Sequence, residues 1–343
     1  MKISRFFPLV TAFLLVFSVH SKPALAQNCL ATGCHQALMG EKNSHQPAAD
    51  GECLACHEQK TPEHPSRNGK AFTLSALGAS LCAQCHELEQ KSIIHLPVAE
   101  GDCLACHDPH GSANLHLLKT PMPDLCLECH AEIRTAIKAK VKHAAVYREE
   151  SCGICHSGHT SSVHALLLAT EKELCLACHG QDDFTRSDPL RNIGLEIEGK
   201  PFLHGPVADG ECSPCHAPHG SPFSRLLRED YPSGPYAPYT KEAYSLCFGC
   251  HDRSMLKSPK ATADTGFRSG SRNLHYLHVA DPRKGRVCTT CHASHASASP
   301  KLINESGFSF GNWTIPVNFK ATSQGGSCAP GCHKAVQYDR TKP

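Results

Sequence analysis

Residues 95–112 read HLPVAEGDCLACHDPHGS, and this stretch recurs with small changes along the chain. It holds a Cys-x-x-Cys-His motif at Cys103, Cys106 and His107, a histidine eight residues before the first cysteine, and another three residues after the motif. Nine such motifs are present: Cys53/Cys56/His57, Cys82/Cys85/His86, Cys103/Cys106/His107, Cys126/Cys129/His130, Cys152/Cys155/His156, Cys175/Cys178/His179, Cys212/Cys215/His216, Cys247/Cys250/His251 and Cys288/Cys291/His292. Because units of about fifty residues carry the motifs in pairs, the sequence predicts a repeat architecture.

The four remaining cysteines form two longer motifs, one near each end of the chain. They are Cys29-Leu-Ala-Thr-Gly-Cys34-His35 and Cys328-Ala-Pro-Gly-Cys332-His333. A longer spacer can loop outward while both sulfurs and the histidine keep their places. We therefore expect all eleven motifs to do the same chemistry, and no cysteine is left over.

Cys-x-x-Cys-His is the attachment signature of c-type haem, in which the thiols bond the porphyrin vinyl groups and the imidazole binds iron. Structural zinc and disulfide frameworks also use paired cysteines. Neither requires a histidine directly after the second cysteine, yet one stands there in every motif, although the chain has only 25 histidines in 343 residues. We expect about eleven covalent haem c groups, nine at the ordinary motifs and two at the longer ones.

The second axial ligand of each iron is expected to be histidine. Outside the first 26 residues only Met39, Met122 and Met255 could give methionine ligation, whereas thirteen histidines lie outside the motifs. Because methionine ligation raises the potential of a haem, bis-histidine haems should have low potentials.

These extra histidines recur at fixed places. One set lies eight residues, or nearly so, before a motif cysteine, and a second set lies three residues after a motif histidine. The first unit lacks a histidine of the second kind and offers His64 instead. The ten candidate ligands are His45, His64, His95, His110, His143, His159, His204, His219, His278 and His295. The eleventh should be His116, His164 or His275, which fall outside the repeat register.

The motifs divide the chain after residue 26 into one leading haem site and five paired units. The leading site covers 27–44, and the units cover about 45–90, 91–140, 141–200, 201–260 and 261–343 within a single multihaem region, 27–343. With about 29 residues per haem, neighbouring haems cannot be insulated from one another, so we expect a multistep path for electrons.

Residues 1–26 have the features of a cleaved export signal. Lys2 and Arg5 precede an apolar run at 6–19, and small residues at 24–26 offer a cleavage site. No later segment reaches eighteen consecutive apolar residues, so no transmembrane segment is expected after cleavage. We expect an exported protein, in the periplasm or else associated with the outer membrane or extracellular.

The charge balance argues against nucleic acid as a partner. Cleavage removes three of the 34 basic side chains and leaves 31 against 32 acidic ones, before two propionates per haem are added. The loaded protein should therefore be acidic, which disfavours nucleic acid and favours redox proteins with basic patches.

Regular secondary structure should be sparse, because glycine and proline are frequent and aromatic residues make up only 6%. We expect a mostly irregular fold with short α-helices and little β-structure. The best helix signal covers 131–146, with Ile133, Ile137 and Val141 in one stripe. Residues 229–240 indicate a loop, and 308–319 a strand or short hairpin.

The paired units, with Cys-x-x-Cys-His-x-Pro-His-Gly-Ser followed by Leu-Cys-x-x-Cys-His, resemble the doubled Cys-x-x-Cys-His multihaem cytochromes of metal-reducing bacteria. The resemblance covers almost all of the chain after residue 26. It implies short helices and loops around closely packed haems, and respiratory electron transfer across the periplasm or to extracellular acceptors. Expected partners are redox donors and acceptors, including other multihaem cytochromes or an outer-membrane conduit. The two longer motifs and the missing third-position histidine after His57 depart from the pattern.

Two other functions stay open. A multihaem reductase would keep one iron five-coordinate for substrate, but every motif here ends in histidine and the spare histidines outnumber the irons. A cytochrome filament would take a haem ligand from the next subunit, and the terminal motifs are where such sharing would occur. We expect an electron carrier rather than an enzyme, with no catalytic residue.

Overall fold

The computed structural model describes residues 29–62, 64, 70–185, 190–240 and 242–342. The expected export signal at 1–26 lies outside these residues. Within them, no helix is long and apolar enough to cross a membrane.

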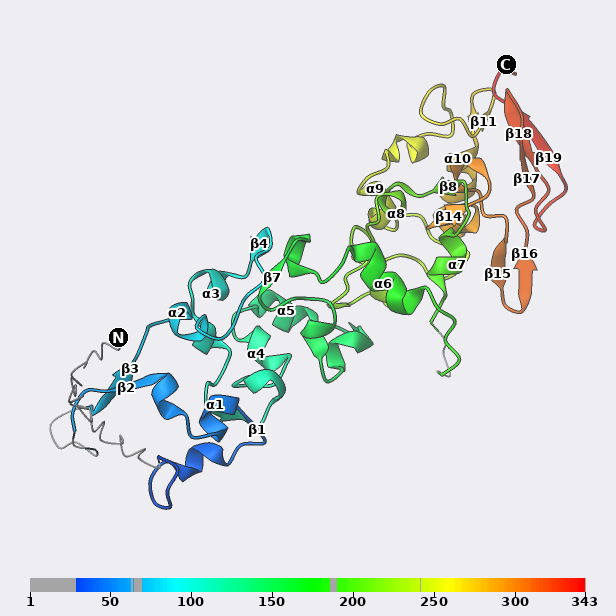
Figure 1. The fold of residues 1–343 in the computed structure, drawn as a ribbon. Coiled ribbons are helices and arrows are strands. Elements are labelled where there is room, and N and C mark those ends of the chain that lie inside the picture. Colours follow the sequence, from blue (N-terminus) through cyan, green and yellow to red (C-terminus); the bar gives the residue numbers. More distant parts are fainter. Residues whose placement is uncertain (1–28, 63, 65–69, 186–189, 241, 343) are drawn as a thin grey trace, which may run out of the picture.

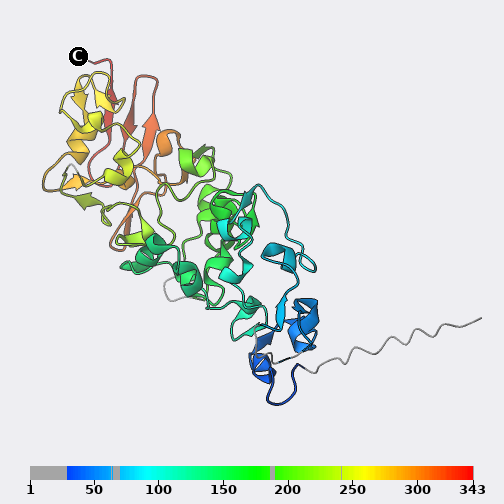
Figure 2. The ribbon, with the colours of Figure 1, turned by 90° about the vertical axis from the view of Figure 1, so that its left-hand side faces the viewer.

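The described chain is elongated, and its units follow one another in sequence order along its length. In Figure 1 the colours run from blue at one end, near β1 and α1, to red at the other, near β17–β19, and Figure 2 shows the same progression from the side. Each unit therefore contacts mainly the units before and after it, as in other repeat proteins.

The helices are short. The α-helices are α1 (Gln46–Ala49), α2 (Ala79–Cys82), α3 (Leu96–Ala99), α4 (Asp124–Leu127), α5 (Ala131–Ala136), α6 (Glu171–His179), α7 (Ile193–Ile197), α8 (Gly205–Ala208), α9 (Ser245–Phe248) and α10 (Leu274–Val279). The 3-10 helices are η1 (Gln36–Met39), η2 (Cys53–Ala55), η3 (Cys103–Ala105), η4 (Leu115–Leu117), η5 (Ala144–Tyr147), η6 (Ser151–Ile154), η7 (His164–Leu166), η8 (Ser224–Leu226), η9 (Arg253–Leu256), η10 (Cys288–Thr290) and η11 (Pro300–Leu302). Helix α6 begins with a capping box in which Thr170 and Glu173 bond each other's backbone N–H groups.

Most strands belong to two-stranded antiparallel ribbons. The strands are β1 (Asn43–Ser44), β2 (His57–Gln59), β3 (Phe72–Leu74), β4 (Ile93–Ile94), β5 (Gly111–Ser112), β6 (Val141–Lys142), β7 (Thr160–Ser161), β8 (Phe202–Leu203), β9 (Gly220–Ser221), β10 (Tyr236–Ala237), β11 (Arg268–Ser269), β12 (Arg272–Asn273), β13 (Gly285–Arg286), β14 (Ala296–Ser297), β15 (Phe308–Phe310), β16 (Trp313–Ile315), β17 (Phe319–Ala321), β18 (Gly325–Cys328) and β19 (Val336–Asp339). The last three form a sheet in the order β17-β18-β19. The predicted fold class, mostly irregular with short helices and little β, is confirmed.

Four of the ribbons join consecutive units. One strand lies just before the first histidine of a unit that is outside the motifs. The other strand lies after the first motif of the next unit. These ribbons are β1–β5, β4–β7, β6–β9 and β8–β14.

The prediction of one long helix over 131–146 is wrong beyond its first six residues. Helix α5 ends at Ala136, because Val141 and Lys142 form β6 and pair with Ser221 and Gly220 of β9. Tertiary pairing with the next unit therefore overrides the local helical pattern. The hairpin predicted within 308–319 is confirmed as β15–β16, whereas the expected loop at 229–240 holds one short strand, β10.

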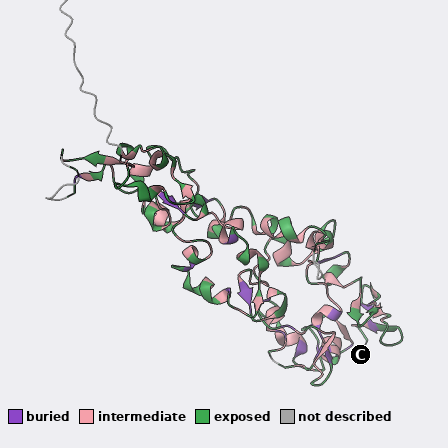
Figure 3. Ribbon diagram, turned by 90° about the horizontal axis from the view of Figure 1, so that it is seen from below, coloured by how far each residue is buried: buried purple, intermediate pink, exposed green. Residues whose placement is uncertain are grey.

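Buried side chains are few and scattered, as Figure 3 shows. A hydrophobic core cluster lies in the last two units and comprises Leu227, Tyr231, Tyr244, Leu256, Val279 and Val287. Tyr244 is fully buried there. Since apolar burial supplies most of the stability of ordinary domains, so small a core leaves the earlier units to be held by other contacts.

A repeated serine supplies one such contact. Its hydroxyl donates to the backbone carbonyl six residues later at 2.5 Å in four successive units. It also accepts from the backbone N–H two residues later at 2.9–3.0 Å. The four buried serines are Ser112, Ser161, Ser221 and Ser297. This serine latch closes the loop after each first motif of units 2 to 5.

Candidate functional site

Most of the motifs share one local geometry. In seven of them the N–H of the motif histidine donates to the carbonyl of the first cysteine at 2.9–3.1 Å. The leading motif closes in the same way, since His35 donates to the Cys29 carbonyl at 3.0 Å. Its two additional residues are accommodated by a turn in which Gly33 has a φ of +83°. A longer spacer thus preserves the hydrogen bond that positions the histidine.

The second longer motif lies in the last sheet. Cys328 ends β18, while Cys332 and His333 lie in the connection to β19. The His333 Nδ1 lies 2.7 Å from the Lys334 carbonyl oxygen. The last motif is therefore held by a sheet that sequence patterning did not predict.

The structure brings each of ten motif histidines beside one histidine from outside the motifs. The two ring centres lie 5.8–6.5 Å apart, and the ring planes are nearly parallel, at 4–26°. The pairs are His35–His64, His86–His45, His57–His110, His130–His95, His107–His159, His179–His143, His156–His219, His251–His204, His216–His295 and His292–His275. The eleventh motif histidine, His333, acts electrostatically on His278. We call the member from outside the motif the distal histidine.

This separation fits two imidazoles on opposite sides of one metal ion. A transition metal bonds an imidazole nitrogen at about 2 Å, and the ring centre lies about 1 Å farther on, so two opposed rings have centres about 6 Å apart. The measured distances match this value at all ten pairs. The donor set also fits haem, because two thiols stand beside each motif histidine.

Hydrogen bonds fix which ring nitrogen is free to bind metal. In units 2 to 5 the first motif histidine donates its Nδ1–H to the carbonyl nine residues later at 2.8–2.9 Å, which leaves Nε2 as the acceptor. The histidines are His107, His156, His216 and His292, and their acceptors are His116, Ala165, Arg225 and Lys301. Each acceptor has a positive φ of 56–61°, so the strained turn aims its carbonyl at the ring.

The four ribbons carry the distal histidines of units 1 to 4. In the first ribbon, the N–H of His45 donates to the carbonyl of His110, so the distal histidines of His86 and His57 are neighbours. His45 also donates its Nδ1–H to the Pro109 carbonyl at 2.8 Å. One ribbon thus serves both sites of a unit, and one of its strands comes from the next unit.

In unit 5 the distal histidine His275 lies on helix α10, which also carries His278. His275 and His278 are three residues apart, a spacing that places them on one face of the helix. The Nδ1 of His275 lies 2.6 Å from the Thr265 hydroxyl, and His278 donates to the Leu274 carbonyl at 2.7 Å. Burial lowers the pKa of His275 to about 4, so the ring is neutral near pH 7 and its nitrogen is available to a metal.

The three histidines that fall outside the repeat register thus differ in position. His275 is in a pair, whereas His116 and His164 are in none of the imidazole pairs found in the described residues. The backbone of His116, rather than its ring, contributes to the site by accepting from His107. The sequence signal that could have found His275 is its i, i+3 spacing from His278.

Cysteines of consecutive sites lie close enough to influence the pKa of one another's thiols. At five junctions the two thiols are within hydrogen-bonding reach: Cys29–Cys53, Cys82–Cys103, Cys126–Cys152, Cys175–Cys212 and Cys247–Cys288. At the five alternate junctions the thiols interact electrostatically: Cys56–Cys82, Cys106–Cys129, Cys155–Cys178, Cys215–Cys250 and Cys291–Cys332. The sites therefore follow one another in space in the order of the sequence.

No disulfide joins the 22 cysteines, all of which lie in the described part of the chain. The same part holds no group of three or more His, Cys, Asp or Glu side chains placed to bind one metal ion. The recurring grouping is instead two thiols with two opposed imidazoles.

Comparison with known proteins bears on these repeats. The family defined by the doubled CXXCH motif matches residues 45–91, 95–135, 143–184, 204–256 and 281–310, which together make up more than half of the chain. The five matches fall where the five paired units were predicted, and the leading motif and the final longer motif lie outside them. No curated protein matches the chain.

Proposed function

Because the chain belongs to the doubled CXXCH family of multihaem c-type cytochromes, which transfer electrons, we propose that it holds eleven haems in single file, each with two axial histidines. Haem iron, when bound, supplies a one-electron Fe(III)/Fe(II) couple. The observation that carries the proposal is the ten opposed imidazole pairs, 5.8–6.5 Å between centres.

In this assignment all 22 motif cysteines attach haem and all eleven motif histidines bind iron. The eleven distal histidines complete the ligation, with His278 serving the site of His333. The hydrogen bonds from Nδ1 to backbone carbonyls hold one ring of such a pair in a fixed orientation, which would limit rearrangement when the charge at the site changes. A reductase with an open iron is the weaker candidate, because ten of the eleven motif histidines already face a distal histidine.

Single file gives the electron path two ends. The leading motif, before β1, lies at one end of the elongated chain, and the last motif, between β18 and β19, lies at the other (Figure 1). We propose that electrons enter at one end and leave at the other, exchanged with redox proteins such as other multihaem cytochromes or an outer-membrane conduit. Haem propionates would add negative charge to a nearly neutral polypeptide, which favours partners with basic patches over nucleic acid.

We further propose that the protein is exported and works in respiratory electron transport, in the periplasm or at the cell surface. The features of residues 1–26 support export. A filament built by shared ligation is not favoured at the leading site, because His35 already faces His64 within the chain.

The test is an electron paramagnetic resonance spectrum of the oxidised protein together with an intact mass of the same sample. Eleven haems with only low-spin signals are expected. A mass with fewer haems would overturn the count. A stoichiometric high-spin signal would overturn the ligation and make the reductase the leading candidate.

A further inference from the structure

One distal histidine differs from the others in its second hydrogen bond. The Nδ1 of His295 lies 3.0 Å from Oε2 of Glu196, and both side chains are largely buried, 22% and 24% exposed. The corresponding nitrogens of His45 and His95 face the backbone carbonyls of Pro109 and Gly158 instead. His295 thus donates to a full negative charge rather than to a carbonyl.

Local structure holds Glu196 in place. Asn192 caps helix α7 by accepting from the N–H of Leu195 at 3.1 Å, and Gly194 packs so tightly on Gly180 that a Cβ there would lie 3.0 Å from its Cα. Helix α7 also contacts β14, the strand that follows His295. The packing of helix α7 therefore holds Glu196 beside His295. A carboxylate on an exposed, mobile side chain would not be held in this way.

We propose that Glu196 is a positioning residue that lowers the reduction potential of the haem ligated by His216 and His295. The inference rests on the proposed function, because it needs those two imidazoles to share one iron. A carboxylate that accepts from a metal-bound imidazole makes the ring a stronger electron donor. A stronger donor stabilises Fe(III) over Fe(II), and so the potential of that haem falls.

The other carboxylates near ligand histidines do not reach this geometry. Asp108 lies 3.7 Å from the Nδ1 of His110, and Glu132 lies 3.6 Å from that of His130, both beyond hydrogen-bond range. These side chains are also 40–73% exposed, so water screens their charge. Of these three carboxylates, Glu196 alone lies at hydrogen-bond distance from a proposed ligand.

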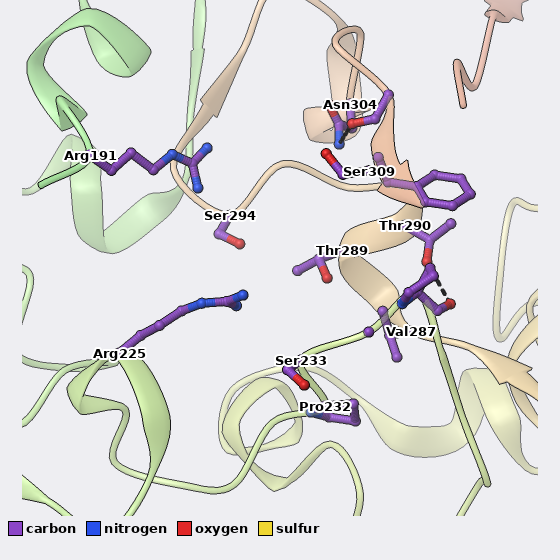
Figure 4. A pocket seen from close by; sticks show the side chains of 14 residues that line it. Arg191, Arg225, Pro232, Ser233, Val287, Thr289, Thr290, Ser294, Asn304 and Ser309 are labelled. Atoms are coloured by element: carbon purple, nitrogen blue, oxygen red, sulfur yellow. Dashed lines mark hydrogen bonds between the residues drawn. The ribbon is translucent and has the colours of Figure 1, made fainter. Parts of the chain in front are cut away.

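Two arginines lie near this site. Arg191 moderates the charge of Glu196, with which it forms an ion pair through its Nε. Arg225 contributes its backbone carbonyl, which accepts a hydrogen bond from His216. Figure 4 shows both guanidinium groups directed toward the same cavity, with Ser294 between them. Arg191 draws charge away from Glu196, so its removal should strengthen the effect of the carboxylate on His295.

The site of His216 and His295 lies inside the row of sites, and this position would affect electron transfer. His216 belongs to the eighth of eleven motifs, so the site has neighbours on both sides. Because of Glu196, an electron would occupy this site less readily than it would without the carboxylate. This haem of lowered reduction potential would divide the row of haems into two groups. An electron that passes from one group to the other would have to cross this less easily reduced site.

The experiment is a spectroscopic redox titration of the loaded protein with Glu196→Gln, which keeps an acceptor but removes the charge. One eleventh of the haem absorbance should titrate at higher potential, by about tenfold in its reduction equilibrium, or about 59 mV for one electron. Glu198→Gln is the matched control, since it removes the same charge from an exposed residue two positions away. Titrations of Glu196→Gln and the unchanged protein that superimpose, or an equal shift in the control, would overturn the proposal.

A second variant tests the opposite sign. Arg191→Gln should move the same eleventh of the absorbance to lower potential, whereas Lys200→Gln, a nearby exposed control, should not. Haem count and spin state are measured on every sample. Eleven low-spin haems with no shift would refute the tuning alone, whereas a missing or high-spin haem in the unchanged protein would refute the proposed function.

Discussion

Units 1 to 4 and unit 5 present their distal histidines on different supports. In units 1 to 4 the support is a two-stranded ribbon, one strand of which comes from the next unit. In unit 5, helix α10 carries His275 and His278 instead. The difference shows that a unit can supply from its own sequence a support that the other units build together with a neighbour.

The two supports are stabilised differently. A ribbon has only two residue pairs in register and relies on the serine latch and on the ligands themselves. Helix α10 adjoins the small core of the last two units, through Val279, and is capped by Asn273. We therefore expect damage to a ribbon to stay local, whereas damage to the helix support should affect two sites at once.

The largest effect is expected for Asn273→Ala. Asn273 is 1% exposed, accepts from the N–H of Tyr276 at 3.0 Å, and donates to the carbonyls of Met255 and Ser258 at 2.9 Å. Its loss should cost about 2–4 kcal/mol, because a cap disappears and two carbonyls lose a donor. Denaturant unfolding should show this loss, and paramagnetic resonance should show high-spin signals from two haems.

Asp252→Ala is the control for this change. Asp252 caps η9 by accepting from the N–H of Ser254 at 2.8 Å, but it is exposed and its helix carries no distal histidine. It should cost about 0.5–1 kcal/mol and leave all haems low-spin. If Asn273→Ala behaves no differently from Asp252→Ala, the helix is not the support of the last two sites.

The next effect tests a ribbon across units. His159 of unit 3 lies 5.8 Å, centre to centre, from His107 of unit 2. His159→Ala should leave eleven haems attached but turn one of them high-spin, visible in the same resonance spectrum. Because His164 is in no pair, His164→Ala should change nothing. A high-spin signal from His164→Ala, or no such signal from His159→Ala, would contradict the assignment of His159 as the distal ligand opposite His107.

The sequence was enough to predict the attachment motifs and the repeat, because both are local patterns. A motif of five residues carries its own chemistry, and the fixed spacing before Cys103 marks His95 as a ligand candidate. It did not reveal which motif histidine the ring of His95 faces, which is His130. That depends on the pairing of β4 with β7 across units, which no local pattern encodes.

The choice among His116, His164 and His275 was likewise beyond the sequence. It depends on the turn at His116, whose positive φ of 57° directs a backbone carbonyl, and not the ring, at the neighbouring site. The mistaken helix at 131–146 has the same origin, since β6 exists only because β9 pairs with it. Contacts between units decided each of these features.

A smaller effect is expected at the serine latch, which occurs in the ribbon units and in unit 5 alike. Ser161 is 4% exposed, and its hydroxyl donates to the Leu167 carbonyl at 2.5 Å and accepts from the Val163 N–H at 2.9 Å. Ser161→Ala should lower the free energy of unfolding by about 1–2 kcal/mol without changing haem spin state. Its neighbour Ser162 is exposed, so Ser162→Ala should leave the unfolding midpoint unchanged. Equal midpoints for the two variants would show that the latch contributes nothing.

The smallest effect concerns the turn that aims a carbonyl at each first motif histidine. Ala165 has a φ of +56° and accepts from His156 through its backbone alone. Ala165→Gly relieves a left-handed strain of about 1–2 kcal/mol but adds freedom to the unfolded chain, so we expect a net gain of about 0.5 kcal/mol in chemical denaturation. Ala144→Gly, at an exposed position in η5 without a positive φ, should instead destabilise. A loss of stability in Ala165→Gly would mean that the alanine methyl group, and not the backbone, holds the turn.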